Sequence, residues 1–378
     1  MIIKWALTNK CNLNCKHCYN ADLRKSNDDI TLYDAKKAID DMKDNNVTNI
    51  QFLGGEPLLY SNITDIIKKC TDNGITSWIN TNGTLIDNGY AKSLVEAGVR
   101  TFIFSIDGPN KSINDEIRGE GSFNKAIKGL EAILRNKKEN MLVTINTIVS
   151  KKAVLKIDDM IDFISYYNKI DGITISLPDM VGNASNQDKK LWSDYETYYN
   201  SLTIFAQKLV KIKSKINVDI GAPPLVKWYF DKKYDTNFFK STKEYCMGGS
   251  SVFFLDADGI LYPCNLPSGI KYFRKINTYK ELLKNCNIKY KRFQDIFTRN
   301  EYLKFFQYVR SRDLTARERF SNFICNECPF AKYNLCGISC PLETKRYPHS
   351  ALCELLVKNE TKKIFKNFDK EYKRINEV

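Results

Sequence analysis

Long apolar runs are absent from this sequence of 378 residues, and only two histidines occur, His17 and His349. No stretch approaches the ~18 consecutive apolar residues of a membrane-spanning helix, which excludes an integral membrane protein. Residues 1–6 resemble a strand and lack the basic head and apolar core of a secretory signal, so we expect a cytoplasmic protein. Because imidazole is scarce, any site that holds several metal ions must depend on thiolates.

The excess of basic over acidic residues limits the classes of binding partner that we expect. Lys and Arg outnumber Asp and Glu by 58 to 44, a net charge of +14, and no dense basic block concentrates this excess. Such an excess favours acidic partners, for example an acidic peptide or an acidic redox protein, more than nucleic acid. Hydrophobic content of 43% and charged content of 27% fit a globular protein, and the length predicts two or three domains.

Twelve cysteines gather mainly near the two ends of the chain. In a large chain without an export signal, clustered cysteines indicate metal or redox sites before disulfides. Sets of thiolates suit iron–sulfur clusters or zinc. The twelve are Cys11, Cys15, Cys18, Cys70, Cys246, Cys264, Cys286, Cys325, Cys328, Cys336, Cys340 and Cys353.

Up to about residue 215, short apolar runs alternate with amphipathic stretches, the pattern of a parallel sheet covered by helices. Six such units predict an α/β fold, an open, partial (β/α)6 barrel of TIM type, with ligand loops at the carboxyl ends of its strands. The predicted strands are 2–8, 49–53, 75–80, 101–106, 142–149 and 173–177. The predicted helices are 33–45, 63–73, 87–97, 124–136, 157–167 and 191–212.

Beyond the barrel, predicted at 1–215, this pattern breaks. We interpret residues 216–245 as a connector and 246–378 as a small cysteine-rich domain with a C-terminal helix. One hairpin is predicted, from 252–256 and 260–263, around a turn rich in Asp and Gly. Helical stretches are expected at 278–284, 301–309 and 355–368.

Three thiols follow the first predicted strand within eight residues, at Cys11, Cys15 and Cys18. A short loop can wrap three sulfurs around one small object but cannot easily supply a fourth. On a four-iron cluster, three cysteines leave one iron open to a non-protein ligand. Structural zinc is the alternative, although it requires four ligands.

The second strand ends in Gly54, Gly55, Glu56 and Pro57. Two glycines allow the backbone to approach a ligand closely, and the glutamate can accept hydrogen bonds from an ammonium group. This segment and the three-cysteine loop both lie at the carboxyl ends of neighbouring strands. We expect them to act together.

With these two motifs in this order, the sequence resembles the radical S-adenosylmethionine (SAM) superfamily. The resemblance implies that Cys11, Cys15 and Cys18 bind a [4Fe-4S] cluster, and that SAM chelates its open iron through amino and carboxylate groups. One electron from the cluster would cleave SAM to methionine and a 5′-deoxyadenosyl radical, which abstracts hydrogen from the substrate. The glycine pair, Glu56 and Pro57 would form part of the SAM site.

The same resemblance places further residues near SAM. Arg118 is expected toward the SAM carboxylate, Asn146 near the ribose and Leu177 near the adenine. His17 is expected to support the adenine edge through its backbone. For Ser105 and Asn146, plain capping of strand ends is the alternative. The full set expected at SAM, besides residues 54–57, is His17, Asn82, Ser105, Arg118, Asn146 and Leu177.

The C-terminal cysteines resemble the SPASM domain, an extension of radical SAM enzymes that modify peptides and proteins. All seven family cysteines are present, with seven residues in place of five between Cys328 and Cys336. A four-cysteine zinc knuckle is the alternative. The resemblance implies two auxiliary [4Fe-4S] clusters, three clusters in all. The outer cluster would be held by Cys325, Cys328, Cys336 and Cys353, and the inner by Cys246, Cys264 and Cys340.

The leading functional hypothesis is a maturase that modifies a ribosomally made precursor peptide by a crosslink, thioether, epimerisation or oxidation. Because Cys11 lies so near the start, we expect no leader-recognition module before it, and recognition by the barrel or a separate protein. A ferredoxin or flavodoxin is the expected electron donor. Cys70 and Cys286 receive no ligand role, and Cys70 is expected to be a small buried hydrophobe.

Three other functions compete with this one. An anaerobic sulfatase-maturing enzyme is disfavoured because that family typically has an aspartate base where this chain has Asn265, which is a poor proton acceptor. A small-molecule dehydrogenase of the same superfamily has the same motifs. A non-enzymatic metal-binding scaffold or sensor would not cleave SAM.

Overall fold

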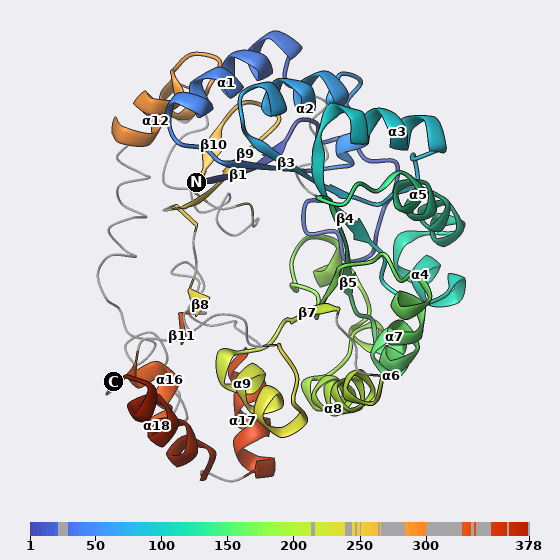
Figure 1. The fold of residues 1–378 in the computed structure, drawn as a ribbon, viewed down its shortest axis with the longest axis vertical. Coiled ribbons are helices and arrows are strands. Elements are labelled where there is room, and N and C mark those ends of the chain that lie inside the picture. Colours follow the sequence, from blue (N-terminus) through green and yellow to red (C-terminus); the bar gives the residue numbers. More distant parts are fainter. Residues whose placement is uncertain are drawn as a thin grey trace.

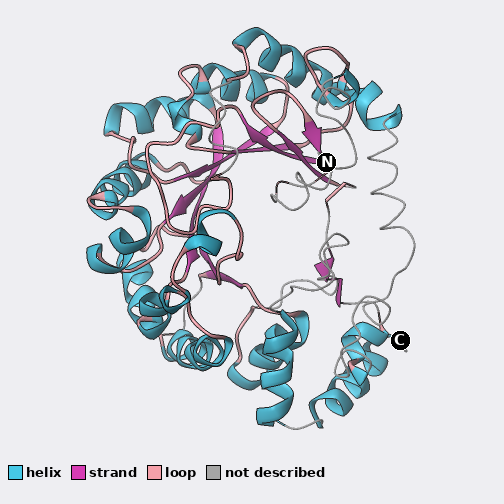
Figure 2. Cartoon of the chain, turned by 180° about the vertical axis from the view of Figure 1, so that it is seen from behind, coloured by secondary structure: helices cyan, strands magenta, loops and turns pink. Residues whose placement is uncertain are grey.

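The computed structural model describes residues 1–21, 29–212, 216–238, 244–245, 248–249, 251–263, 265, 284–299, 327–333, 336–337, 349–360 and 363–376. Within these residues, a nine-stranded sheet has the order β10-β9-β1-β2-β3-β4-β5-β6-β7. The sheet curves, and helices follow its outer side (Figure 1). Seen from behind, the strands occupy the inside of an arc of helices (Figure 2).

The barrel strands β1 to β7 pair in parallel, each with the next along the chain. Every predicted strand is present, with ends displaced by at most two residues, and the predicted fold class is confirmed. The strands are β1 (Ile2–Ala6), β2 (Asn49–Leu53), β3 (Thr76–Thr81), β4 (Val99–Ser105), β5 (Leu142–Ile148), β6 (Gly172–Ser176) and β7 (Asn217–Ile220).

The seventh parallel strand, β7, lies in the segment that we interpreted as a connector. It is only four residues long, and its two apolar side chains, Val218 and Ile220, are both buried. So short an alternation is a weak sequence signal. The helix α9 (Pro224–Tyr234) follows it, with the second of two prolines at its first position, where a missing N–H does no harm.

The helices of the barrel alternate with the strands and include two that the pattern did not predict, α4 and α6. Asn110 caps α4 by accepting a hydrogen bond from the Ile113 backbone amide, and Ser150 caps α6 in the same way. The helices are α1 (Leu32–Asp44), α2 (Ile63–Asp72), α3 (Asn88–Ala97), α4 (Lys111–Arg118), α5 (Ser122–Asn136), α6 (Lys151–Leu155), α7 (Ile157–Tyr166) and α8 (Tyr195–Lys211).

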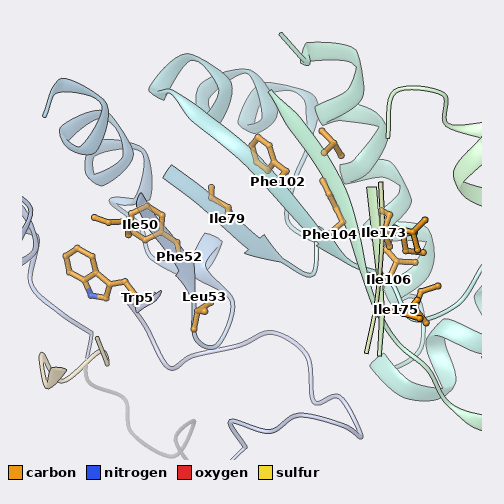
Figure 3. Packing of buried hydrophobic residues seen from close by; sticks show 14 of the residues in the cluster. Trp5, Ile50, Phe52, Leu53, Ile79, Phe102, Phe104, Ile106, Ile173 and Ile175 are labelled. Atoms are coloured by element: carbon orange, nitrogen blue, oxygen red, sulfur yellow. The ribbon is translucent and has the colours of Figure 1, made fainter. Parts of the chain in front are cut away.

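The two faces of the sheet differ in chemistry because side chains alternate along each strand. On the helix side, large apolar side chains such as Trp5, Phe52 and Phe102 are fully buried and fill the layer between strands and helices (Figure 3). Their neighbours on the inner face are polar and half-buried, for example Lys4 and Gln51. The core therefore lies outside the strands and leaves a polar interior.

The predicted hairpin is formed by β9 (Val252–Leu255) and β10 (Leu261–Tyr262), around Gly259, which has a φ of +89°. It does not stand apart from the barrel, because β9 pairs in parallel with β1. The sheet of the barrel is thereby extended beyond its first strand. The division of the chain into 1–215, 216–245 and 246–378 stays a prediction.

The C-terminal helices pack against the last helices of the barrel. The prediction at 355–368 corresponds to two helices, α17 (His349–Glu360) and α18 (Lys363–Asn376), and α17 contacts α8 and α9. Phe368 lies edge-on to Trp228, with ring centroids 5.0 Å apart. The predictions at 301–309 and at nearly all of 278–284 fall outside the described residues.

Four short elements complete the described C-terminal part. The helix α12 (Phe293–Arg299) lies against α1, where the Phe293 backbone amide donates to Asp41 at 2.8 Å. β8 (Glu244–Tyr245) pairs in parallel with β11 (Cys336–Gly337), and α16 (Pro329–Lys332) contacts α18. Among the described helices, none is long and apolar enough to cross a membrane.

The contact between α5 and the loop after β3 provides a test of the fold. A Cβ at Gly129 would lie 2.1 Å from the carbonyl oxygen of Gly83. Gly129→Ala should therefore destabilise the protein by about 1–3 kcal/mol, although the same change in an ordinary helix stabilises by up to about 1 kcal/mol. Gly89→Ala on α3, where the nearest atom lies at 3.5 Å, is the control. Chemical denaturation measures both, and equal effects would contradict the packing.

Candidate active site

The three-cysteine loop crosses the carboxyl ends of the strands and is joined to the end of β2 by main-chain contacts. The amide of Gly55 donates to the Thr8 carbonyl at 3.1 Å, and that of Glu56 to the Lys10 carbonyl at 2.8 Å. A Cβ at Gly55 would lie 1.9 Å from the Lys10 oxygen. Only glycine allows this approach.

The middle of the loop is fixed from the other side of the barrel. The Lys16 amide donates to the Ile117 carbonyl on α4 at 2.9 Å, and the Asn183 amide donates to the Cys18 carbonyl at 3.0 Å. Asn183 also donates from its side chain to the Cys15 carbonyl at 3.0 Å. Segments more than 100 residues away in the sequence thus set the shape of the loop.

A cavity of about 250 Å³ lies under this loop, at the carboxyl ends of β2, β3, β4 and β5. Most of the residues predicted at SAM line it together with the cysteines. Pro57 and Leu177 are not among its lining residues, whereas Pro178 and Asp179 are. The predicted residues in the lining are Cys11, Cys15, His17, Cys18, Gly54, Gly55, Glu56, Asn82, Ser105, Arg118 and Asn146.

Glu56 is 2% exposed and its carboxylate is held by three donors. Oε1 accepts from the Thr81 hydroxyl at 2.7 Å and the Leu58 amide at 3.2 Å, and Oε2 accepts from the Asn82 amide at 2.8 Å. Burial raises the pKa of Glu56 to about 7, against the effect of these hydrogen bonds. Its ionisation is therefore sensitive to a cationic group in the cavity.

Asp107 is a second acid beside the cavity, and it is fully buried just after the end of β4. Its carboxylate pairs with the guanidinium of Arg118, at 2.7 Å to Nε and 3.0 Å to Nη2, and lies 2.7 Å from Nε2 of His17. Burial alone would raise the pKa of Asp107, but Arg118 and His17 outweigh it and hold the pKa at about 2.

Asp107 was not among the residues that the sequence led us to expect at SAM. An acid at the carboxyl end of a barrel strand, eleven residues before Arg118, was the available signal. The pairing itself depends on how α4 folds back over the strand end, which spacing does not encode. His17 was expected to act through its backbone, and the structure adds a side-chain contact with Asp107.

The chemistry of the donors fits an iron–sulfur cluster. Burial raises the pKa of the Cys15 thiol to about 11, while Arg118 acts in the opposite direction, so a bound cation would have to displace the proton. Among the described residues, no three Cys, His, Asp or Glu side chains converge tightly enough to hold one metal ion. Three thiols that line one cavity can bind a multi-iron cluster with one iron left open, whereas structural zinc requires four ligands.

The cavity also contains a polar atom that lacks a partner. Asn20 is 3% exposed, its amide nitrogen lies 3.5 Å from the Gly54 carbonyl, and its Oδ1 has no hydrogen-bond partner within the described part of the chain. A buried acceptor without a donor is costly. It therefore suggests a bound molecule with donor groups, as SAM has.

A polar bridge links β1 to the residue that follows Cys264. Lys4 Nζ donates to Oδ1 of Asn265 at 3.4 Å, and the Asn265 amide donates to the Tyr19 hydroxyl at 3.3 Å. Tyr19 lines the cavity. Asn265 thus reaches the neighbourhood of the site, but its amide cannot accept a proton as a carboxylate base would.

The C-terminal cysteines are only partly within the described residues. Cys246, Cys264, Cys325 and Cys340 lie outside them. Cys328 is buried, Cys353 is half-buried, and the register of β11 with β8 places Cys336 opposite Glu244, two residues before Cys246. Cys70 is fully buried on α2, as expected for a small hydrophobe, and Cys286 is buried as well.

This fold and site define a class of proteins, the partial β/α barrels that carry a three-cysteine loop over their strand ends. Residues 5–164 of this chain match the radical SAM superfamily. An AdoMet-dependent heme synthase of Methanosarcina barkeri is 28% identical over 310 residues, which cover 76% of this chain and 87% of the relative. The mycofactocin maturase MftC of Mycolicibacterium smegmatis is 26% identical over 192 residues, which cover 51% and 47%.

Solved structures share the fold at lower identity. Streptococcus suis SuiB, bound to the precursor peptide SuiA, superposes with a TM-score of 0.68 at 19% identity, over 92% of this chain and 74% of SuiB. The enzyme anSMEcpe, with bound AdoMet and the Cp18Cys peptide, gives 0.65 at 16% identity, over 97% and 100%. The fold is thus shared along nearly the whole chain.

The approach of Gly55 to Lys10 leads to a prediction about the loop. Gly55→Ala should push the segment before Cys11 away from β2, because a methyl group cannot fit 1.9 Å from a carbonyl oxygen. We expect a melting temperature several degrees lower and less iron bound on anaerobic reconstitution. Gly89→Ala, on the surface of α3, is the matched control. Full iron incorporation by Gly55→Ala would show that the loop does not need this contact.

Proposed function

We propose that this protein is a radical SAM enzyme that modifies a peptide, by a crosslink, thioether, epimerisation or oxidation. The observation that carries the proposal is one cavity that the three thiols and the buried Glu56 line together. This cavity lies at the carboxyl ends of the strands, whose inner face is polar and half-buried. A peptide substrate is supported by the fold that the chain shares with SuiB, solved with its precursor peptide, and by the similarity to the maturase MftC.

In this proposal Cys11, Cys15 and Cys18 hold a [4Fe-4S] cluster beside SAM. When bound, these groups supply one-electron reductive cleavage of SAM and hydrogen abstraction from the substrate. Glu56 accepts a hydrogen bond from the SAM amino group, and the amide oxygen of Asn20 accepts a further hydrogen bond. The remaining predicted lining residues, and Pro57 and Leu177 just outside, form the rest of the SAM site.

The inner face of the barrel offers hydrogen-bonding groups to a peptide. Gln51 donates to Asn80 at 2.7 Å, and Asn80 lines the cavity. Lys4 and Asn265 continue this polar surface toward β9. Such groups can pair with peptide amides and carbonyls, whereas the apolar core on the helix side is closed to them.

The C-terminal cysteines would hold two auxiliary clusters as the resemblance implies, with the outer one at Cys325, Cys328, Cys336 and Cys353. A ferredoxin or flavodoxin would deliver the electron. The net charge of +14 would attract such acidic proteins and accelerate their encounter. Since Asn265 replaces the expected base, sulfatase maturation is not proposed.

A second candidate is the modification of a tetrapyrrole. It is favoured by the heme synthase of Methanosarcina barkeri, whose similarity covers more of this chain than that of MftC does. The discriminating experiment measures 5′-deoxyadenosine and substrate mass in the reduced, reconstituted enzyme. It compares an iron-containing porphyrin with synthetic peptides that correspond to any short reading frame beside the gene. A change in tetrapyrrole mass with none in any peptide would overturn the peptide proposal.

Removal of the loop thiols is the most direct test of enzyme against scaffold. Changing Cys11, Cys15 and Cys18 together to Ala should abolish 5′-deoxyadenosine release and remove about four of about twelve irons per chain, four for each cluster. The auxiliary clusters should survive because their ligands are separate. Cys70→Ala, which alters a buried cysteine on α2, should keep both properties. A wild-type protein that cleaves no SAM would be a scaffold or sensor, and one that saturates near four irons would lack the auxiliary clusters.

Glu56 should make SAM binding dependent on pH. Its pKa is about 7 in the folded protein, so the carboxyl is mostly protonated at pH 6 and is then a weak acceptor for the N–H groups of the SAM amino group. SAM binding then requires the release of one proton, and affinity should rise by up to about tenfold per unit as pH increases toward 7. Calorimetric titration of the cluster-loaded, unreduced enzyme measures the slope.

Glu56→Gln is the matched variant for this slope. It retains the size of the side chain but cannot ionise, so affinity at pH 8 should fall roughly ten- to hundred-fold, as for the loss of a charge-assisted hydrogen bond. The rise with pH below 7 should also disappear. If the variant binds SAM as tightly as the wild type does, Glu56 is not the residue that contacts the SAM amino group.

A further inference from the structure

Arg118 is a buried cation in direct contact with a cysteine of the proposed cluster. Its side chain is 7% exposed, and Nη1 donates to the sulfur of Cys15 at 3.9 Å, within the range for hydrogen bonds to sulfur. The other edge of the guanidinium is occupied by Asp107. The guanidinium is therefore held in one orientation, with a single N–H group aimed at the thiol.

Asp107 in turn has little freedom to move. Besides Arg118, its carboxylate accepts from the Ile148 backbone amide at 3.0 Å and lies beside His17, and its own amide donates to Asn114 at 2.9 Å. The ion pair is therefore built into the junction of β4, β5 and α4. It would form before and without SAM.

A fixed charge next to a cluster ligand changes the energy of adding an electron. Reduction by one electron makes the cluster more negative, so a nearby cation favours the reduced state and a nearby anion opposes it. Hydrogen bonds to cluster sulfurs act in the same direction as the cation, and these are known controls of iron–sulfur potentials. Low dielectric around buried groups strengthens both effects.

We infer that Arg118 and Asp107 are positioning residues that set the reduction potential of the cluster at Cys11, Cys15 and Cys18, through opposite charges held beside Cys15. This inference rests on the proposed function, since it assumes a cluster at these thiols. The step concerned is the uptake of one electron from a low-potential donor, and no bond is formed or broken in it. Arg118 raises the potential, and Asp107 limits the rise.

Two substitutions test this by the sign of their effects. Arg118→Gln removes the cation and should make one-electron reduction at least tenfold less favourable, a midpoint potential lower by about 59 mV or more. Asp107→Asn removes the anion, retains the shape and should shift the potential upward. Potentials are measured without SAM, by redox titration followed by electron paramagnetic resonance. The signal concerned is the one that disappears when the three loop cysteines are changed to Ala.

The controls separate charge from structure. Arg118→Lys keeps the cation but loses the guanidinium hydrogen bonds to Asp107 and Cys15, and it should stay closer to the wild type than Arg118→Gln. Arg100→Gln removes the same charge from an exposed site at the amino end of β4 and should leave the potential unchanged. Iron content of each variant reports cluster occupancy. If Arg118→Gln fails to hold a cluster, the upward shift in Asp107→Asn still decides the question.

Each outcome has one meaning. Shifts of opposite sign support the inference, and shifts of the same sign, or none, overturn it and leave Arg118 and Asp107 as structural residues. Either of these outcomes leaves the proposed function intact. If no cluster signal depends on the three cysteines in the wild type, the proposed function fails, and this is seen before any variant of Arg118 or Asp107 is made.

Discussion

The close backbone contact between the segment after β1 and the glycine pair after β2 is the constraint on which the site depends. The amides of Gly55 and Glu56 donate to the carbonyls of Thr8 and Lys10, and any side chain at position 55 would clash with the Lys10 carbonyl. This contact brings the cysteine loop over the end of β2. It also turns the next residue, Glu56, inward to meet the loop after β3.

The two buried acids of the site, Glu56 and Asp107, differ in how readily they ionise. Glu56 accepts hydrogen bonds from neutral donors only, and desolvation dominates its pKa. Asp107 has a cation within 3 Å and stays ionised throughout the physiological range. The ionisation of Glu56 can therefore respond to a cationic ligand, whereas Asp107 forms a charge pair with Arg118 that no ordinary change of pH alters.

The sequence was sufficient for the parts of the fold that repeat. Apolar runs and amphipathic stretches located β1 to β6, because each repeats the same strand and helix pattern. It was insufficient where the signal is short or the partner is distant. β7 has only two apolar residues, and the parallel pairing of β9 with β1 joins segments about 250 residues apart. The sequence contains Asp107 and His17 but does not reveal that their side chains are in contact, because the curvature of the sheet brings them together.

The position of β1 between β2 and β9 has a consequence for how the protein is made. One neighbour of β1 is synthesised within the next 50 residues, but the other emerges only after residue 252. Contacts of such long range slow folding, and domains generally form as their chain is completed during synthesis. Asn9, next to the cysteine loop, also binds Asp256 of the hairpin turn at 3.2 Å. The segment that leads into the loop can therefore complete these contacts only late in synthesis, once the hairpin has been made.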